Sequence, residues 1–223
     1  MPGLHGCSLL LVLALLTATS CSNDYLSNNT INESAWCMAQ GRGNQLSLIT
    51  DDKSILKLSE SSDSILFLTG LRYRVFYILL GDQGYYASVP GSKLVKITDE
   101  QPVIVEDVIL SSLFTGSVND PVWRNDKPFF GGGFLNLDFQ FLSSSSGILH
   151  GIHLLQDSLV NRKLYMKLGH FANGDVTGSR VSALASFPIS SIQNASNADS
   201  LIILMLDDAT HYNSYGLALK DTL

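Results

Sequence analysis

The stretch V-W-R-N-D-K-P-F-F-G-G-G-F-L-N-L-D-F-Q-F-L, residues 122–142, decides the fold class of this chain. In its second half apolar and polar residues alternate. The apolar set is Leu135, Leu137, Phe139 and Phe141, and the polar set is Asn136, Asp138 and Gln140. A period of two is typical of a strand with one face in a core and the other in solvent. The pattern therefore predicts a buried Phe139, an exposed Asn136, and a loop at the glycine triplet 131–133.

Short apolar segments recur on both sides of this stretch, separated by Gly, Ser and Asn. We expect further strands at 45–50, 65–69, 72–80, 85–89, 94–97, 148–155, 163–168, 181–189, 201–206 and 215–219. The segment 51–64 fits a helical turn or a loop, and 103–113 fits a strand or a helix. Many short strands at this spacing, with no long helical pattern, predict an all-β chain folded as a sandwich or jelly roll.

The N-terminus has the pattern of a signal peptide. Residues 9–16, L-L-L-V-L-A-L-L, form an apolar run that is too short to span a bilayer. Ala18 and Ser20 place small residues before Cys21, so we expect residues 1–20 to be removed and the product to be secreted and extracellular. A bacterial lipoprotein acylated at Cys21 is the alternative, and A-T-S-C is a poor acylation signal.

Composition excludes several classes of function. Charged residues make up 15% of the chain and the mean hydropathy is +0.19, which fits a packed core rather than disorder. The formal net charge of −6 argues against binding to nucleic acid or to an anionic membrane surface. No later apolar run is long enough for a membrane span.

Secretion leads to two expectations about covalent modification. Cys7 leaves with the signal peptide, and Cys21 and Cys37 can form one disulfide in an oxidising compartment. Three Asn-X-Ser/Thr triplets predict N-glycosylation at Asn28, Asn32 and Asn194.

The candidates for site chemistry are few. His150 and His153 resemble a metal pair, but an odd spacing on a strand points them to opposite faces. Asp207 and Asp208 with His211 suggest a relay, although no nucleophile motif lies nearby. Acidic side chains could instead bind calcium, as in many extracellular sandwiches; the candidate ligands are Asp138, Asp175, Asp207 and Asp208. No catalytic residue or organic cofactor is expected, so the chain is predicted to be non-enzymatic.

Several blocks, in order, resemble the extracellular region of the discoidin domain receptors, which are collagen-binding receptor tyrosine kinases. The blocks are A-W-C at 35–37, L-R-Y-R-V at 71–75, G-Y-Y-A-S-V-P-G at 84–91, L-S-S-L-F-T-G-S-V-N-D-P-V-W-R-N at 110–125 and F-L-N-L-D-F-Q-F at 134–141. The resemblance implies a galactose-binding-like jelly roll. It divides the chain into a partial discoidin-like segment, 21–80, and a discoidin-like sandwich, 81–223.

The resemblance also implies a partner, namely a collagen-like matrix protein or a related receptor. The chain departs from the family because 38–70 is too short for a complete first sandwich, and because no kinase follows. We therefore expect a secreted adhesion protein with weak or no affinity for collagen. The alternatives are a lectin-like module, from A-W-C and Q-L-S-L-I, and a laminin-G-like sandwich, from F-Q-F and L-Y-M-K-L.

Overall fold

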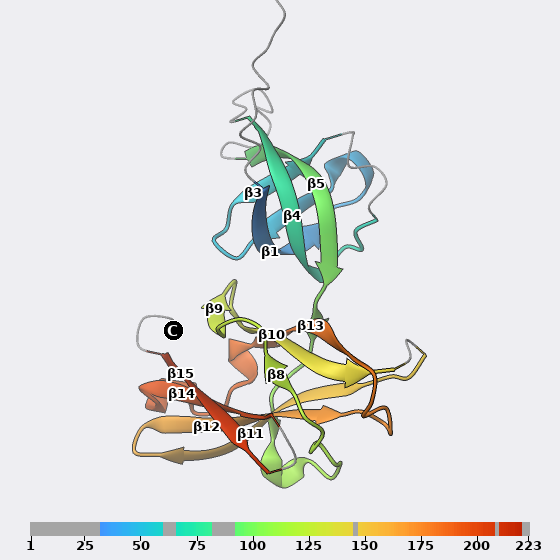
Figure 1. Cartoon of the computed structure of the whole chain (residues 1–223). Coiled ribbons are helices and arrows are strands. Elements are labelled where there is room, and N and C mark those ends of the chain that lie inside the picture. Colours follow the sequence, from blue (N-terminus) through green and yellow to red (C-terminus); the bar gives the residue numbers. More distant parts are fainter. Residues whose placement is uncertain (1–31, 60–65, 82–91, 145–146, 208–209, 220–223) are drawn as a thin grey trace, which may run out of the picture. The chain divides into compact units, whose positions relative to one another are not determined.

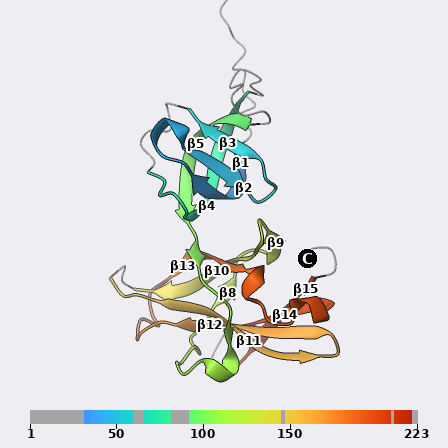
Figure 2. The ribbon, with the colours of Figure 1, turned by 180° about the vertical axis from the view of Figure 1, so that it is seen from behind.

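The computed structural model describes residues 32–59, 66–81, 92–144, 147–207 and 210–219, all within one compact unit, Ile31–Leu223. The described chain is all-β, as the sequence predicts, and Figures 1 and 2 show its strands from two sides. No helix in these ranges is long and apolar enough to cross a membrane. The strands form a small closed barrel followed by two sheets that share one core.

The barrel uses the first five strands in the order β1-β2-β3-β5-β4, and β4 closes back onto β1. Its elements are β1 (Asn32–Gln40), η1 (Gly43–Gln45), β2 (Ser47–Thr50), β3 (Ile55–Leu58), β4 (Arg72–Gly81) and β5 (Ser92–Pro102). All neighbours are antiparallel except β3 and β5. Closure removes the open edges and encloses a separate apolar core, which includes Leu48, Leu56, Val75 and Val95.

The first sheet of the sandwich has the order β6-β13-β10-β8, with β9 also paired to β10. Its strands are β6 (Ile104–Val105), β8 (Trp123–Arg124), β9 (Phe129–Gly131), β10 (Phe134–Ser143) and β13 (Ser179–Pro188). The long pair β10–β13 is antiparallel over the whole of β10, with Phe139 opposite Ala183.

The second sheet has the order β15-β14-β12-β11-β7. Its strands are β7 (Ile109–Leu110), β11 (Gly151–Val160), β12 (Lys163–Phe171), β14 (Ser200–Leu206) and β15 (Tyr212–Ala218). Short 3₁₀ turns lie between strands at η3 (Ser111–Leu113), η4 (Ile189–Ser191) and η5 (Ala195–Asn197). The two sheets bury a common core of aliphatic and aromatic residues, with Phe139, Phe187, Leu154 and Ile203 among its members.

The predicted burial of residues 135–141 is correct for one face of β10 only. Leu135, Leu137 and Phe139 are fully buried in the sandwich core, and Phe141 is 9% exposed. The expected solvent face is wrong, because Asn136 is 0% exposed and Asp138 only 6%. Both polar side chains are covered by residues of the barrel, so β10 is buried on its two faces over this part of its length.

Other strand predictions differ from the structure in particular places. The segment 66–69 is not a strand, and Leu66 and Leu68 are exposed. The segment 51–64 contains β3, and 103–113 contains β6, β7 and η3. The strand expected at 85–89 lies outside the described residues.

Candidate functional site

Arg72 lies at the centre of a polar network between β4 of the barrel and β10 of the sandwich. Its Nη2 donates to both carboxylate oxygens of Asp51 at 2.9 Å and to Asn136 Oδ1 at 3.1 Å. Its Nε donates to Ser186 Oγ at 3.1 Å, and its guanidinium carbon lies 4.2 Å from the ring centroid of Phe134. Arg72 is 2% exposed. A buried guanidinium requires such partners because its charge loses its hydration.

The glycine triplet allows the sandwich backbone to approach Asp51. Gly132 and Gly133 have φ of +60° and +85° and form the turn between β9 and β10. Both positive values suit a two-residue hairpin of the primed type. A Cβ on Gly132 would lie 2.3 Å from Asp51 Oδ1, so only glycine fits beside that carboxylate.

A second pair joins the same two strands. Arg74 Nη1 donates to Asp138 Oδ2 at 2.8 Å, and Asn125 Nδ2 donates to Asp138 Oδ1 at 2.9 Å. The Nε of Arg74 is buried and has no hydrogen-bond partner among the described residues. Asn136 and Asp138 of β10 thus serve as partners of two barrel arginines.

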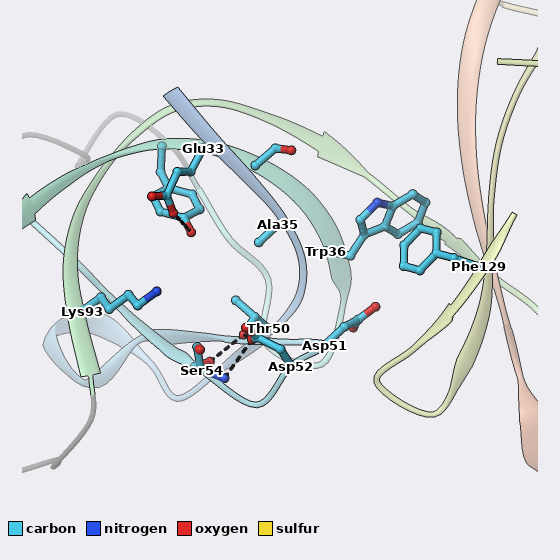
Figure 3. Close-up of a pocket in the computed structure, with 11 residues that line it drawn as sticks. Glu33, Ala35, Trp36, Thr50, Asp51, Asp52, Ser54, Lys93 and Phe129 are labelled. Atoms are coloured by element: carbon cyan, nitrogen blue, oxygen red, sulfur yellow. Dashed lines mark hydrogen bonds between the residues drawn. The ribbon is translucent and has the colours of Figure 1, made fainter. Parts of the chain in front are cut away.

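A pocket of about 360 Å³ opens next to this network. Its lining comes from β1, from β2 and the following turn, from β4 and β5, and from β9; the residues are Glu33, Ser34, Ala35, Trp36, Thr50, Asp51, Asp52, Ser54, Tyr77, Lys93 and Phe129. Figure 3 shows Trp36 and Phe129 on one side and Lys93 reaching in from the other. The two rings meet edge to face, with centroids 5.6 Å apart. The pocket therefore combines carboxylates, hydroxyls and an aromatic wall.

Each carboxylate of the pocket is held in place by neighbouring groups. Thr50 Oγ1 donates to Asp52 Oδ1, and Ser54 N donates to the same oxygen at 3.1 Å. These bonds lower the pKa of Asp52 below its ordinary value of 3.8. Tyr77 Oη donates to Glu33 Oε2 at 2.7 Å, and burial together with this bond raises the pKa of Tyr77 above 10.0. Tyr77 therefore stays neutral and acts as a donor that fixes Glu33.

Asp51 joins the pocket to the polar network. Burial raises the pKa of Asp51 above 3.8, and the charge and hydrogen bonds of Arg72 act in the opposite direction. Among the lining residues that the structure describes, Lys93 is the one cation, against the carboxylates of Glu33, Asp51 and Asp52. The pocket is thus acidic beside an aromatic ring, an arrangement that suits a ligand cation.

The aspartates expected to bind calcium have separate partners. Asp138 contacts Arg74, Asp207 accepts from Asn213 Nδ2 at 2.7 Å, and Asp175 accepts from Ser144 N at 2.9 Å. Asp208 lies outside the described residues. Within the described ranges no group of three or more His, Cys, Asp or Glu is arranged to hold a metal. Calcium binding stays a prediction.

The two histidines take different partners, and His150 lies just before β11 rather than on it. His153 Nδ1 lies 3.0 Å from Glu106 Oε2. His150 Nδ1 lies 2.9 Å from His170 Nε2, and His150 Nε2 lies 3.3 Å from Asp175 Oδ2. The turn expected at Asp207 and Asp208 falls between β14 and β15, where Asp207 N donates to His211 O at 3.0 Å.

The predicted modification sites are only partly described. Cys37 is 0% exposed and has no disulfide partner among the described residues, and burial raises its pKa to about 12. Cys21 and Asn28 lie outside the described residues. Asn32 begins β1, and Asn194 precedes η5; both are exposed. The disulfide and the glycosylation sites stay predictions.

The pocket and the arginine network were missed by the sequence reasoning. Glu33, Asp52 and Lys93 come from three separate strands or turns, and no local motif links them. Trp36 is the one available signal, and in the sequence it stands out only as part of the A-W-C block at 35–37. Asp51 next to Asp52 gave no hint of Arg72, because that contact depends on barrel closure.

Comparison with known families and with solved structures shows which proteins this chain is similar to. Residues 115–218 match the family model of the NigD-like C-terminal beta sandwich domain. The comparison with curated proteins gave no match. Structural matches include proteins from Bacteroides and Parabacteroides species.

Three of these structures illustrate the likeness. A NigD-like immunity protein from Bacteroides caccae ATCC 43185 has a TM-score of 0.59 and 18% identity over 86% of this chain and 93% of that one. A protein of unknown function from Bacteroides vulgatus ATCC 8482 has a TM-score of 0.65 and 15% identity over 86% and 94%. A candidate lipoprotein from Bacteroides fragilis NCTC 9343 has a TM-score of 0.61 and 10% identity over 85% and 98%. At identities this low, the structural likeness shows that the fold is shared and nothing more.

These findings overturn the discoidin receptor interpretation, together with its collagen-like or receptor partners and the lectin-like and laminin-G-like alternatives. Of the blocks that suggested it, 134–141 lies on β10, 110–125 is mostly loop, and 84–91 lies outside the described residues. The blocks at 35–37 and 71–75 lie on paired strands of the barrel, where Ala35 is opposite Val75. Such apolar alternation is common to many β-proteins and does not identify one family. The chain is instead similar to the NigD-like domain over its sandwich and shares its fold with these Bacteroides proteins over most of its length.

Proposed function

We propose that this chain is a non-enzymatic binding protein of the immunity type, located in the cell envelope, which holds a basic segment of a toxin-type protein in its acidic pocket. The observation that carries the proposal is the convergence of Glu33, Asp51 and Asp52 beside the ring of Trp36. A lysine or arginine side chain could place its charge near these carboxylates and its alkyl stem on the ring.

The fixed carboxylates support binding rather than catalysis. Glu33 is held by Tyr77, Asp52 by Thr50 and Ser54, and Asp51 by Arg72. Carboxylates held by hydrogen bonds are organised in advance for a cation, which reduces the ordering cost of binding. A general base for catalysis instead needs a pKa near the operating pH, and the pKa of Asp52 is shifted away from it.

The structural relatives support the biological setting. One of them is named a NigD-like immunity protein, and another is named a toxin-related protein, from Parabacteroides distasonis ATCC 8503. Electrostatic complementarity between the acidic pocket and a basic partner would favour rapid and specific association.

The envelope location has its own support and its own test. The apolar run at 9–16 precedes Cys21, and a relative is named a candidate lipoprotein. A lipid on Cys21 would exclude the Cys21–Cys37 disulfide. Mass spectrometry of the mature N-terminal peptide separates an acylated Cys21 from a disulfide-linked one.

A protection assay tests the function. A deletion strain and a complemented strain are challenged with supernatants of Bacteroides strains that inhibit the deletion strain. Complementation should restore growth against at least one supernatant, and the double variant Glu33→Gln with Asp52→Asn should not. Asp107→Asn changes an exposed acid outside the pocket and should protect like the wild type. Equal sensitivity of the deletion and complemented strains to every inhibitory supernatant would reject the immunity function.

A further inference from the structure

The last strand of the second sheet, β15, is an open edge. It pairs with β14 from Tyr212 to Ala218, and its other side has no strand partner among the described residues. Figure 1 shows β15 as the outermost strand of its sheet. An unpaired strand edge presents backbone donors and acceptors that can bind another extended chain.

The other open edges of the sandwich are protected in recognisable ways. The strands β6, β7 and β8 each have only two residues. Beyond its short pairing with β6, β13 carries Arg180. Beyond its pairing with β7, β11 carries Asp157 and an irregularity between Gln156 and Ser158. Short strands, charges and bulges are the usual protection against edge pairing.

The strand β15 lacks all three protections. Its seven residues, Y-N-S-Y-G-L-A, include no charged residue and no proline, and its pairing with β14 is regular throughout. Alternate residues are exposed: Tyr212, Ser214, Gly216 and Ala218. Ser214 lies opposite Leu204, which itself lies opposite Lys167, so these three residues form one row across the sheet.

Two cations are held beside this edge by the tyrosines of β15. Lys167 Nζ lies 5.2 Å from the ring centroid of Tyr212 and donates to Asn119 Oδ1 at 2.9 Å. The guanidinium carbon of Arg124 lies 4.5 Å from the ring centroid of Tyr215. Neither cation forms an ion pair within the described part of the chain. Tyr212 and Tyr215 are an odd number of residues apart, so their rings, and the cations that they contact, lie on opposite faces of β15.

We propose that β15 binds an extended, acidic polypeptide segment as an added strand. The backbone edge supplies hydrogen bonds, and Lys167 and Arg124 favour acidic side chains on the added strand. This surface uses none of the pocket residues, so it stands whether or not the pocket binds a toxin.

The test is a titration of ¹⁵N-labelled protein followed by NMR. The probe is a blocked octapeptide of alternating threonine and glutamate, and the control replaces each glutamate by lysine. The acidic peptide should cause saturable shifts concentrated at the amides of 212–218, and the basic peptide should not. Equal binding of the two peptides, or the absence of saturable shifts at β15, would overturn the proposal.

Matched variants separate the edge from general charge effects. Ser214→Glu should lose binding of the acidic peptide because it opposes like charges, and Ser214→Lys should retain it. Lys167→Gln should weaken binding, whereas Lys96→Gln, on an exposed position of the barrel, should not. Thermal unfolding checks that each variant is folded. Concentration-dependent shifts of the β15 amides without peptide would show pairing with a second copy and would overturn the proposed occupant.

Discussion

Arg72 Nη2 donates a hydrogen bond to Asn136 Oδ1 at 3.1 Å across 64 residues of sequence. Asn136 also accepts from Ser186 Oγ at 2.6 Å and donates to Asp51 Oδ2 at 3.0 Å. A residue that the sequence places on a solvent face is thus the partner of a buried charge. This contact sets the acidic pocket, because the same arginine holds Asp51 in its lining.

Asn136→Ala should destabilise the protein. The substitution removes an acceptor from buried Arg72 and a donor to Asp51, and each unsatisfied buried group costs about 1–3 kcal/mol. Gln140→Ala is the matched control on the same strand, since Gln140 is less buried and its hydrogen bonds are 3.4 and 3.5 Å long. Urea unfolding of both variants measures the difference, and equal free energies of unfolding would contradict the assigned role of Asn136.

Phe139→Ala should cost about 3–5 kcal/mol of unfolding free energy, because the ring is fully buried in the sandwich core and a cavity would remain. Phe171→Ala should cost much less, since Phe171 is 42% exposed. Denaturant unfolding checks both. A Phe139 variant as stable as the wild type would place the core on the wrong face of β10.

Cys37 should be unreactive in the folded protein. Its thiol is fully buried, and burial raises its pKa to about 12, so the thiolate that reacts with thiol reagents is scarce at pH 8. Labelling with a chromogenic disulfide reagent, with and without urea, measures this. One additional thiol should react on unfolding. Rapid labelling of Cys37 in the native protein would contradict its position in the barrel core.

Stability should fall as the pH drops below about 6.5. Burial lowers the pKa of His170 below its ordinary value of 6.5, so the unfolded chain binds a proton more readily than the folded chain. The stability that neutral His170 contributes is fully present above pH 6.5. It is lost as the pH falls through the lower pKa of His170 in the folded protein. The pKa of Asp175 is also lowered, chiefly by the hydrogen bond from the Ser144 hydroxyl, but from 3.8, so its contribution is lost only in stronger acid.

Urea midpoints at pH 7.5 and pH 5.5 test this dependence. The wild type should lose stability between the two values, and His170→Gln should lose less. A wild-type urea midpoint that rises on acidification would contradict the predicted direction of the pH dependence.

The strands could be predicted from the sequence where their pattern is local. Alternation at 135–141 and the apolar runs at 72–80 and 201–206 correctly give β10, β4 and β14. The burial of Asn136 and Asp138 could not be predicted, because their partners Arg72 and Arg74 come from a different part of the chain. The strand predicted at 65–69 is wrong over its described part, 66–69. This segment has the composition of a strand, yet it is not one, and Leu66 and Leu68 are exposed.

The candidate site was harder to predict than the fold. The calcium proposal grouped aspartates by residue type, and the structure gives each described one a different partner. The acidic pocket depends on barrel closure, which brings Glu33 of β1 to the same cavity as Lys93 of β5. Neither residue has a distinctive sequence context.

The most direct measurement of the central claim is calorimetric titration of the purified protein with blocked lysine and arginine peptides. At least one of these should bind, an equivalent norleucine peptide should not, and high salt should weaken binding because the attraction is electrostatic. The double variant Glu33→Gln with Asp52→Asn should lose this affinity, while Asp107→Asn should keep it. Binding that is unchanged in the double variant, or equal for norleucine, would contradict a pocket that recognises basic side chains.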